Sequence, residues 1–202
     1  LYGSEKGFAF KRQNDEEGLS GIEAVLKRLD ELEGDFRVRL SSLEPNVVDK
    51  EHVERIVKYK RLCRHLHLSI QSGSNNVLKG MKRRYTRDEY LAIVEAIRSV
   101  DPLYGITTDI IVGFPGETKE DFADTLDVVD KAFLGRVHAF KFSPRQGTEA
   151  AKYKETVTPA DKTARVNELI NRAEHVAQEF QKRNFNTVHR VLVETFEEDY
   201  AT

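Results

Sequence analysis

The stretch His65-Leu66-His67-Leu68-Ser69-Ile70-Gln71-Ser72-Gly73-Ser74 decides the fold of this chain. Leucine and isoleucine occupy its even positions, and histidine, serine and glutamine occupy the odd positions from 65 to 71. Because successive side chains of a strand point to opposite faces, the alternation predicts a strand with one apolar and one polar face. The stretch lies between two helical patterns, where a buried parallel strand is expected, and a buried polar face is costly unless its groups find partners. We therefore predict a barrel or half-barrel whose interior holds a polar ligand.

The same alternation recurs along the chain, and helical patterns separate the alternating segments. This order is typical of a parallel α/β fold with right-handed crossovers. The predicted fold class is α/β, a partial (β/α) barrel of about four parallel strands with their helices. Strands are expected over residues 36–41, 65–70, 106–112 and 137–142, with one more over 188–195, and helices over 20–34, 50–60, 75–81, 86–101, 118–133 and 158–183.

Polar side chains are expected to share the interior of this barrel. The alternation brings five of them to one face, namely Arg39, His67, Gln71, Asp109 and His138. Arg39 and Asp109 are expected to neutralise each other there, since an unpaired buried charge costs far more than a paired one. The alternative is that these groups satisfy one another and contact no ligand.

The segments that follow the four strands are small, polar or rich in glycine and proline. They cover residues 41–45, 71–74, 113–118 and 143–148. In β/α barrels, the residues after each strand form the active face. Glycines allow close approach to the backbone, and a helix that begins at Thr118 offers N–H groups to a ligand. The ligand site is therefore predicted at this end of the sheet.

The overall composition excludes several classes of protein. Charged residues make up 33% of the 202 residues but nearly balance to a net charge of −2, so the total charge does not indicate a nucleic-acid-binding protein. Cys63 is the only cysteine, which leaves no disulfide framework and no cysteine-built metal site within the chain. The sequence has no apolar run of about 18 residues and no signal peptide, so we expect a cytoplasmic protein without a membrane span.

Five segments resemble those of the radical S-adenosylmethionine methylthiotransferases, most closely the branch that acts on N6-threonylcarbamoyladenosine in tRNA. The segments are residues 37–45, 65–74, 81–86, 107–118 and 142–148. The sequence Leu40-Ser41-Ser42-Leu43-Glu44-Pro45 favours this branch over the isopentenyladenosine and ribosomal-protein branches. Those branches remain alternatives, as do another radical enzyme, an ordinary β/α-barrel enzyme and a non-catalytic RNA-binding protein.

The resemblance implies an enzyme that adds a methylthio group to a modified adenosine next to the tRNA anticodon. It implies S-adenosylmethionine as cofactor, a 4Fe-4S cluster that cleaves it, and a second cluster in a separate N-terminal domain. It further implies a tRNA substrate, an electron donor, a monomer, and a small C-terminal β-barrel that binds RNA.

The resemblance also assigns residues to the site. By position, Arg84 and Arg145 would contact RNA, and the remaining set would contact S-adenosylmethionine; no catalytic residue and no metal ligand is assigned. The cofactor set is Ser42, Glu44, Gln71, Ser72, Asp109, Gly113, Phe114, Pro115, Gly116, Glu117, Phe140 and Phe142.

The chain departs from the family pattern in its cysteines. The Cys-x-x-x-Cys-x-x-Cys loop that ligates the radical-generating cluster is absent, and Cys63 alone cannot hold a cluster. The chain also lacks an initiator Met. We therefore expect residues 1–186 to be the C-terminal part of a radical S-adenosylmethionine barrel, and residues 187–202 the start of the truncated RNA-binding β-barrel. Alone, such a chain is expected to bind no cluster and to be inactive.

Overall fold

A parallel sheet forms the centre of the computed structural model, which describes residues 21–191, 193, 195–197 and 200–201. Its three strands lie in the order β1 (His65–His67), β2 (Gly105–Val112) and β3 (Arg136–Lys141). Helices α3 (Asn75–Gly80) and α4 (Arg87–Val100) connect β1 to β2, and α5 (Lys119–Ala132) connects β2 to β3. The predicted alternation of parallel strands and helices is confirmed.

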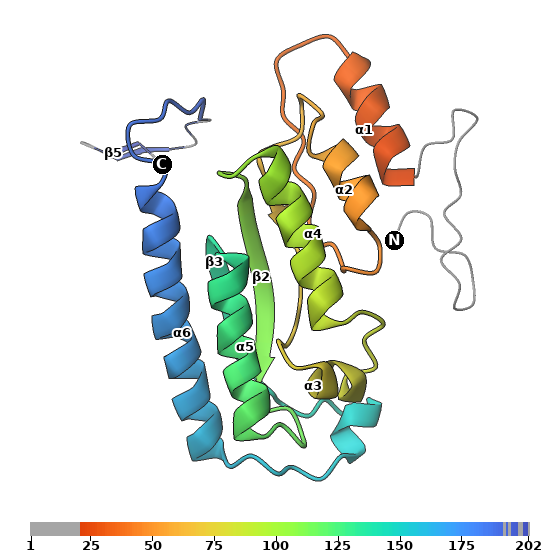
Figure 1. Ribbon diagram of the computed structural model, residues 1–202, viewed down its shortest axis with the longest axis vertical. Coiled ribbons are helices and arrows are strands. Elements are labelled where there is room, and N and C mark those ends of the chain that lie inside the picture. Colours follow the sequence, from red (N-terminus) through yellow and green to blue (C-terminus); the bar gives the residue numbers. More distant parts are fainter. Residues whose placement is uncertain (1–20, 192, 194, 198–199, 202) are drawn as a thin grey trace.

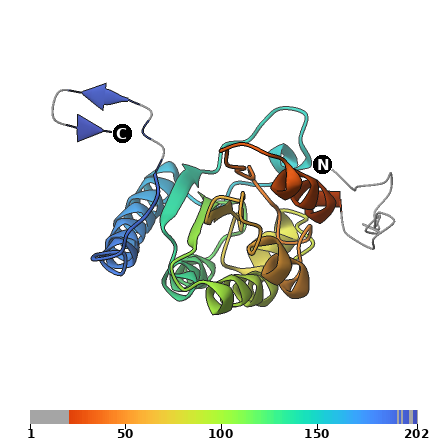
Figure 2. The ribbon, with the colours of Figure 1, turned by 90° about the horizontal axis from the view of Figure 1, so that it is seen from above.

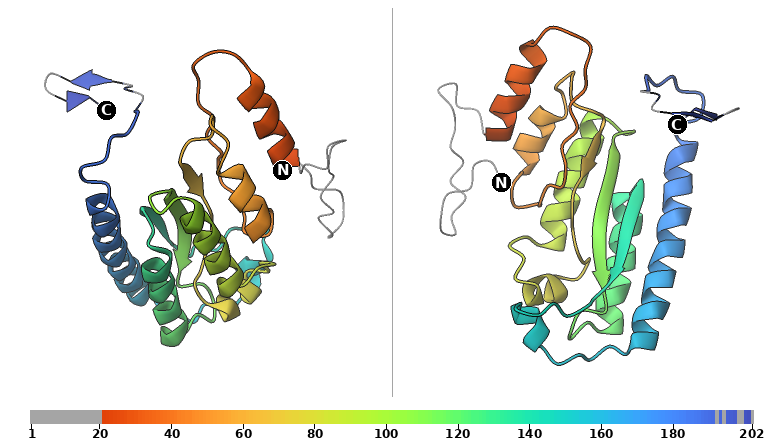
Figure 3. Two further views of the ribbon diagram at one scale, coloured as in Figure 1. Left: turned by 45° about the horizontal axis from the view of Figure 1, so that its top comes forward. Right: turned by 180° about the vertical axis from the view of Figure 1, so that it is seen from behind.

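The helices lie along one side of the sheet. In Figure 1, α4 and α5 lie in front of the strands, and α6 (Pro159–Lys182) runs beside β3. Figure 2 shows the strands from above as a curved layer, with α2 (Lys50–Ile56), α4, α5 and α6 along its outer side. Seen from behind, β2 and β3 are not covered by these helices (Figure 3). The arrangement is an open half-barrel, and α1 (Gly21–Glu31) lies beside α2.

The apolar residues of the alternating stretch form the centre of the core. Leu66, Leu68 and Ile70 are fully buried and belong to one hydrophobic cluster with side chains of the surrounding helices. Burial of each such side chain contributes roughly 1.5–3 kcal/mol. The predicted assignment of this face to the core is confirmed.

Side chains cap helices α2, α4 and α5 at their first turns. Thr86 with Glu89 and Thr118 with Asp121 form capping boxes at α4 and α5. Asp49 accepts the N–H of His52 at 2.8 Å at the start of α2. Each cap satisfies N–H groups that the first helical turn leaves unbonded, so these loops enter their helices at fixed points.

The strand predicted over residues 36–41 does not form. Instead, residues 38–43 make two isolated parallel bridges, one from Val38 to Leu62 and one from Leu43 to Leu68. Val38 bonds with the backbone of residues 61 and 63, whereas Leu43 bonds with that of residues 67 and 69. Because the backbone hydrogen bonds form only at Val38 and at Leu43, residues 38–43 run along the edge of the sheet without a continuous ladder of hydrogen bonds.

The strand predicted over 188–195 is also absent from the part of this range that the structure describes. Val188 and Val191 are exposed there, with no sheet edge or core against which an apolar face could pack. The nearest strands are β4 (Phe196–Glu197) and β5 (Tyr200–Ala201), which pair with each other in antiparallel fashion. A short 3-10 helix, Glu149–Lys152, lies earlier in the chain, between β3 and α6. None of the helices described here is long and apolar enough to span a bilayer.

Candidate functional site

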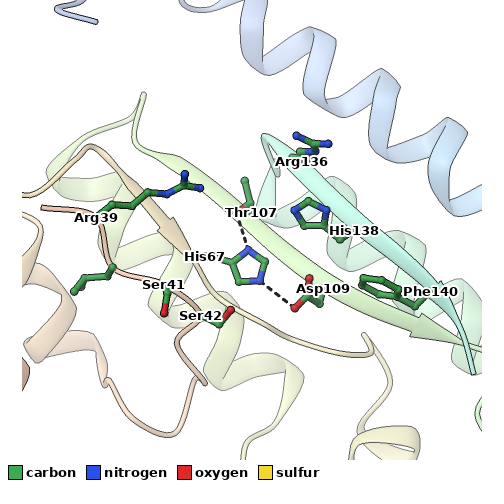
Figure 4. A pocket seen from close by; sticks show the side chains of 10 residues that line it. Arg39, Ser41, Ser42, His67, Thr107, Asp109, Arg136, His138 and Phe140 are labelled. Carbon is green, nitrogen blue, oxygen red and sulfur yellow. Dashed lines mark hydrogen bonds and ion pairs between the residues drawn. The ribbon is translucent and has the colours of Figure 1, made fainter. Parts of the chain in front are cut away.

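The polar faces of the strands meet on the uncovered side of the sheet. Here lies a pocket of about 680 Å³, which we call the inner-face pocket. Figure 4 shows side chains from all three strands and from the segment before β1 directed into it. Its lining residues are Arg39, Leu40, Ser41, Ser42, His67, Thr107, Asp109, Arg136, His138 and Phe140.

Asp109 is held in this pocket by His67 of β1 and by Ser69, which follows that strand. Its Oδ2 lies 3.1 Å from His67 Nε2 and accepts the hydroxyl of Ser69 at 3.1 Å. The expected ion pair between Arg39 and Asp109 is not formed in the described structure, where the Asp109 carboxylate lies against His67 and Ser69 instead. The two residues still line the same pocket.

Thr107 joins the two histidines of β1. Its Oγ1 lies 2.9 Å from His65 Nε2 and 2.9 Å from His67 Nδ1. Burial lowers the pKa of His65, and the charges of Arg39 and His67 lower it further. The two hydrogen bonds to the Thr107 hydroxyl therefore fix the orientations of the His65 and His67 rings.

A second pocket, the strand-end pocket, has a volume of about 630 Å³ and opens at the carboxyl ends of the strands. Phe114 packs edge-on against Phe142, with 5.1 Å between the ring centroids. Tyr153 also packs edge-on against Phe114, with 6.1 Å between the centroids. Phe140 is 51% exposed and lines both pockets, as does Asp109. The combination of aromatic faces with a carboxylate suits a ligand that has both a flat ring and hydroxyl groups.

The loop after β2 is folded back on itself. The buried carboxylate of Glu117 accepts the N–H of Gly113 at 2.9 Å and pairs with Arg165 on α6. Burial raises the pKa of Glu117, and the bonds from Gly113 and Arg165 oppose that rise. Gly113 has φ +73° and leaves no room for a Cβ, which would lie 2.4 Å from Lys162. The bonds of the Glu117 carboxylate therefore stabilise the conformation of this loop.

In the loop after β1, one residue lines a pocket and the next is buried against α5. Gln71 has a positive φ of 70°, exchanges backbone bonds with β2 and lines the strand-end pocket. Ser72 is fully buried, and its Oγ lies near Thr125 of α5 and accepts the N–H of Ser74. Neighbouring residues of one motif thus face opposite ways.

Glu44 and Arg84 line a smaller pocket of about 230 Å³ at the edge of the sheet. Glu44 forms an ion pair with Arg83, and the short helix α3 precedes both arginines.

The three pockets account for nine of the fourteen residues assigned from the sequence. Those that line a pocket are Ser42, Glu44, Gln71, Arg84, Asp109, Phe114, Phe140, Phe142 and Arg145; those that line none of the three are Ser72, Gly113, Pro115, Gly116 and Glu117.

Sequence reasoning missed three residues near the site. Arg136 lines the inner-face pocket, and its alternation with His138 and Phe140 signals this position, but the predicted strand began one residue later. Tyr153 comes from a loop without periodicity. Lys162 of α6 contacts the Gly113 turn, and its ammonium lies 5.3 Å from the Phe142 ring centre; nothing local in the sequence indicates this contact.

The residues of this chain do not fit an iron–sulfur cluster. Such a cluster is held by several thiolates, whereas the half-buried Cys63 is the single cysteine of the sequence. The strand-end pocket does fit a nucleoside, because its aromatic rings and its carboxylate match the two halves of that ligand.

Several known proteins are similar to this chain. It is 44% identical over 177 residues to "Threonylcarbamoyladenosine tRNA methylthiotransferase MtaB" of Thermotoga maritima, which covers 88% of this chain and 41% of that protein. It is 39% identical over 170 residues to "tRNA-2-methylthio-N(6)-dimethylallyladenosine synthase" of Alkaliphilus oremlandii, covering 84% of this chain and 36% of the relative. The chain thus spans about two fifths of the length of these relatives.

The fold matches a solved radical enzyme. The structure of coproporphyrinogen III oxidase (HemN) from Escherichia coli, described as a radical SAM enzyme, superposes with a TM-score of 0.62 at 20% identity. The match covers 77% of this chain and 37% of that structure. The model of the radical SAM superfamily matches residues 14–129, more than half of the chain. This chain belongs to the radical SAM superfamily.

Proposed function

We propose that this chain is part of a tRNA methylthiotransferase that adds a methylthio group to threonylcarbamoyl-modified adenosine next to the anticodon. The observation that carries the proposal is the 44% identity, over 88% of the chain, to a protein named for that reaction. The 39% identity to a dimethylallyladenosine synthase supports the same chemistry on a different adenosine, which is the second candidate.

The cofactor proposed for the strand-end pocket is S-adenosylmethionine. Phe140 and Phe142 offer faces for the adenine, and Gln71 and Asp109 offer acceptors for ribose hydroxyls. Ser42 and Glu44, at the neighbouring edge of the sheet, are proposed to contact the methionine part. When bound, S-adenosylmethionine supplies the radical chemistry of the superfamily together with a 4Fe-4S cluster, whose ligands this chain does not contain.

The scaffold residues of the site orient the ligand and exclude water. Glu117 and Lys162 fix the turn at Gly113, which presents Phe114 to the pocket. Ser72 anchors the loop that presents Gln71. These residues are proposed to act through the shape of the pocket, and the direct ligand contact expected for Ser72, Gly113 and Glu117 stays a prediction.

The partners follow from the proposed reaction. Arg145, exposed at the rim of the strand-end pocket, and Arg84 are proposed to contact tRNA phosphates. Residues 1–186 are proposed as part of the catalytic barrel, and residues 187–202 as the start of an RNA-binding unit. The enzyme would act as a cytoplasmic monomer supplied by an electron donor.

Mass spectrometry of tRNA nucleosides from a strain that lacks the gene tests the function. The methylthio form of threonylcarbamoyladenosine should disappear and return with a plasmid-borne copy. A copy with Phe140→Ala should restore at most about a tenth of it, in line with the loss of an aromatic contact worth about 1.5 kcal/mol. A copy with Asp130→Asn, on the outer helix α5, should restore it fully.

Each other result separates the alternatives. Loss of the methylthio dimethylallyl nucleoside would assign the chain to the second candidate. Unchanged methylthio nucleosides in the deletion strain would overturn the proposal.

A further inference from the structure

Three side chains of the kinds that ligate metals converge in the inner-face pocket. His67 of β1, Asp109 of β2 and His138 of β3 each offer one ligand atom, and these atoms all lie within 4.8 Å of one another (Figure 4). The sheet register sets this arrangement, since Asp109 and His138 are direct cross-strand partners. We propose that His67, Asp109 and His138 bind a divalent transition-metal ion, a site that sequence reasoning did not assign.

The histidine of β1 is oriented for ligation. His67 Nδ1 lies 2.9 Å from Thr107 Oγ1, and its Nε2 points to Asp109 Oδ2 at 3.1 Å. A proton on Nδ1, donated to Thr107, leaves the Nε2 lone pair directed at the proposed ion. Histidine ligands in metal sites have such an outer partner, which fixes the tautomer and the ring orientation.

The carboxylate is oriented in the same way. Ser69, two residues after His67, donates its hydroxyl to Asp109 Oδ2 at 3.1 Å. Both His67 and Asp109 therefore have an outer partner, an arrangement typical of metal ligands.

The distances allow the site to close around an ion. Metal bonds to histidine nitrogen and carboxylate oxygen are about 2.0–2.2 Å long, so ligand atoms on one ion lie about 3–3.5 Å apart. The separation between His67 and Asp109 already matches. His138 must approach by a rotation of its ring, whose centre lies 5.8 Å from that of His67 and at a tilt of 46°. No hydrogen bond within the described structure opposes that rotation.

The pocket leaves room for further ligands of the ion. The side chains of His67 and Asp109 are 13% and 28% exposed toward a cavity of about 680 Å³. Two imidazoles and one carboxylate with open positions are typical of catalytic Zn²⁺ and of non-haem Fe²⁺. Arg39 and Arg136 line the same cavity, so an anionic group bound to the ion would be stabilised there. The proposal is argued from these contacts alone and not from the proposed function, with which it shares the Asp109 side chain.

Titration of the untagged 202-residue chain with Co²⁺ and Zn²⁺ tests the site. The Co²⁺ absorption bands in the visible range report its coordination, and calorimetry reports the Zn²⁺ affinity and stoichiometry. We expect one ion per chain, with Zn²⁺ displacing Co²⁺ and with no competition from Mg²⁺, which prefers oxygen ligands. Thr107→Val should weaken binding about tenfold through the loss of the outer partner of His67.

Two variants remove ligands and one serves as a control. His138→Gln and Asp109→Asn should each weaken binding at least about 100-fold, whereas His175→Gln, at an exposed position of α6, should leave it unchanged. Circular dichroism of each variant confirms that it is folded, and His138 tolerates replacement because it is a half-buried strand residue. A folded chain that gives no Co²⁺ bands, or binding that His138→Gln leaves intact, would overturn the proposal.

Discussion

At the scale of single residues, Gly73 shows how tightly the site loops are packed. A Cβ at this position would lie 2.5 Å from the carbonyl oxygen of Asp124 and 2.5 Å from Cα of Thr125. The N–H of Gly73 also donates to Thr125 Oγ1 at 3.0 Å. The loop after β1 is therefore in direct backbone contact with α5, and only glycine permits that approach.

Gly73→Ala should lower the free energy of unfolding by about 1–3 kcal/mol, because the contacted atoms are backbone and cannot move aside. Urea unfolding followed by circular dichroism measures the change. The matched control is Gly135→Ala, whose added Cβ meets its nearest atoms at 3.5 Å, an ordinary contact, and which should cost about 0.5 kcal/mol or less. Equal losses in the two variants would contradict this account.

At the scale of elements, one carboxylate connects two helices. Asp121 accepts bonds from Ser74 Oγ at 2.5 Å, from Asn76 Nδ2 at 3.3 Å and from the N–H of Thr118 at 2.9 Å. Ser74 caps α3, and Thr118 caps α5. The loops after β1 and β2, which contribute to the strand-end pocket, are thus held in place by the same side chain.

Asp121→Asn should lower the free energy of unfolding at neutral pH by about 1–3 kcal/mol, the usual contribution of hydrogen bonds to a charged group. Burial by itself raises the pKa of Asp121, but the bonds from Ser74, Thr118 and Asn76 outweigh it and hold the pKa below its ordinary value of 3.8. A depressed pKa stabilises the fold above about pH 4, and this contribution is lost as the pH falls through the folded-state pKa. The variant should therefore lose less stability than the wild type below about pH 4.

Urea unfolding at a series of pH values measures both effects of this substitution. Asp130→Asn on the same helix removes an exposed carboxylate and should change the stability at neutral pH by about 0.5 kcal/mol or less. An acid dependence as steep in Asp121→Asn as in the wild type would show that the carboxylate does not act as described.

At the scale of the whole molecule, the described residues from 187 onward contribute no side chain to the hydrophobic core. β4 and β5 pair with each other, and Val188 is fully exposed. Arg190 forms an ion pair with Asp35, but both side chains are more than 70% exposed, at 72% and 71%. Exposed pairs of this kind contribute about 0–1 kcal/mol, so the half-barrel gains little from this segment.

Removal of residues 187–202 should leave the free energy of unfolding within about 1 kcal/mol of the full chain, because the side chains of this segment whose placement is described, such as Val188, Arg190 and Val191, are exposed. Urea unfolding of the shortened chain measures this. Leu169→Ala, in the fully buried face of α6, is the contrasting variant and should cost about 2–5 kcal/mol. A shortened chain that unfolds as readily as Leu169→Ala would place the domain boundary elsewhere.

The candidate site was partly predictable because strand alternation is a local property. The period of two assigns His67, Asp109 and His138 to one face without knowledge of any contact. It does not say which of them meet, and only the packing of the segments brings His67 rather than Arg39 to the Asp109 carboxylate. The inward orientation of the Glu117 side chain could not be predicted from a local pattern either, because its partner Arg165 lies 48 positions away in the chain.

The sequence by itself determined the order of strands and helices, the helix caps, and which face of each strand is apolar. These features depend on residues within one or two turns of each other, so a local pattern is sufficient to specify them. Only the tertiary structure decided that residues 36–41 make one isolated bridge in place of a strand, that residues 188–191 form no strand, and that two histidines and an aspartate meet in one pocket. Those outcomes depend on backbone partners and side-chain distances between segments far apart in the chain, and no local pattern encodes them.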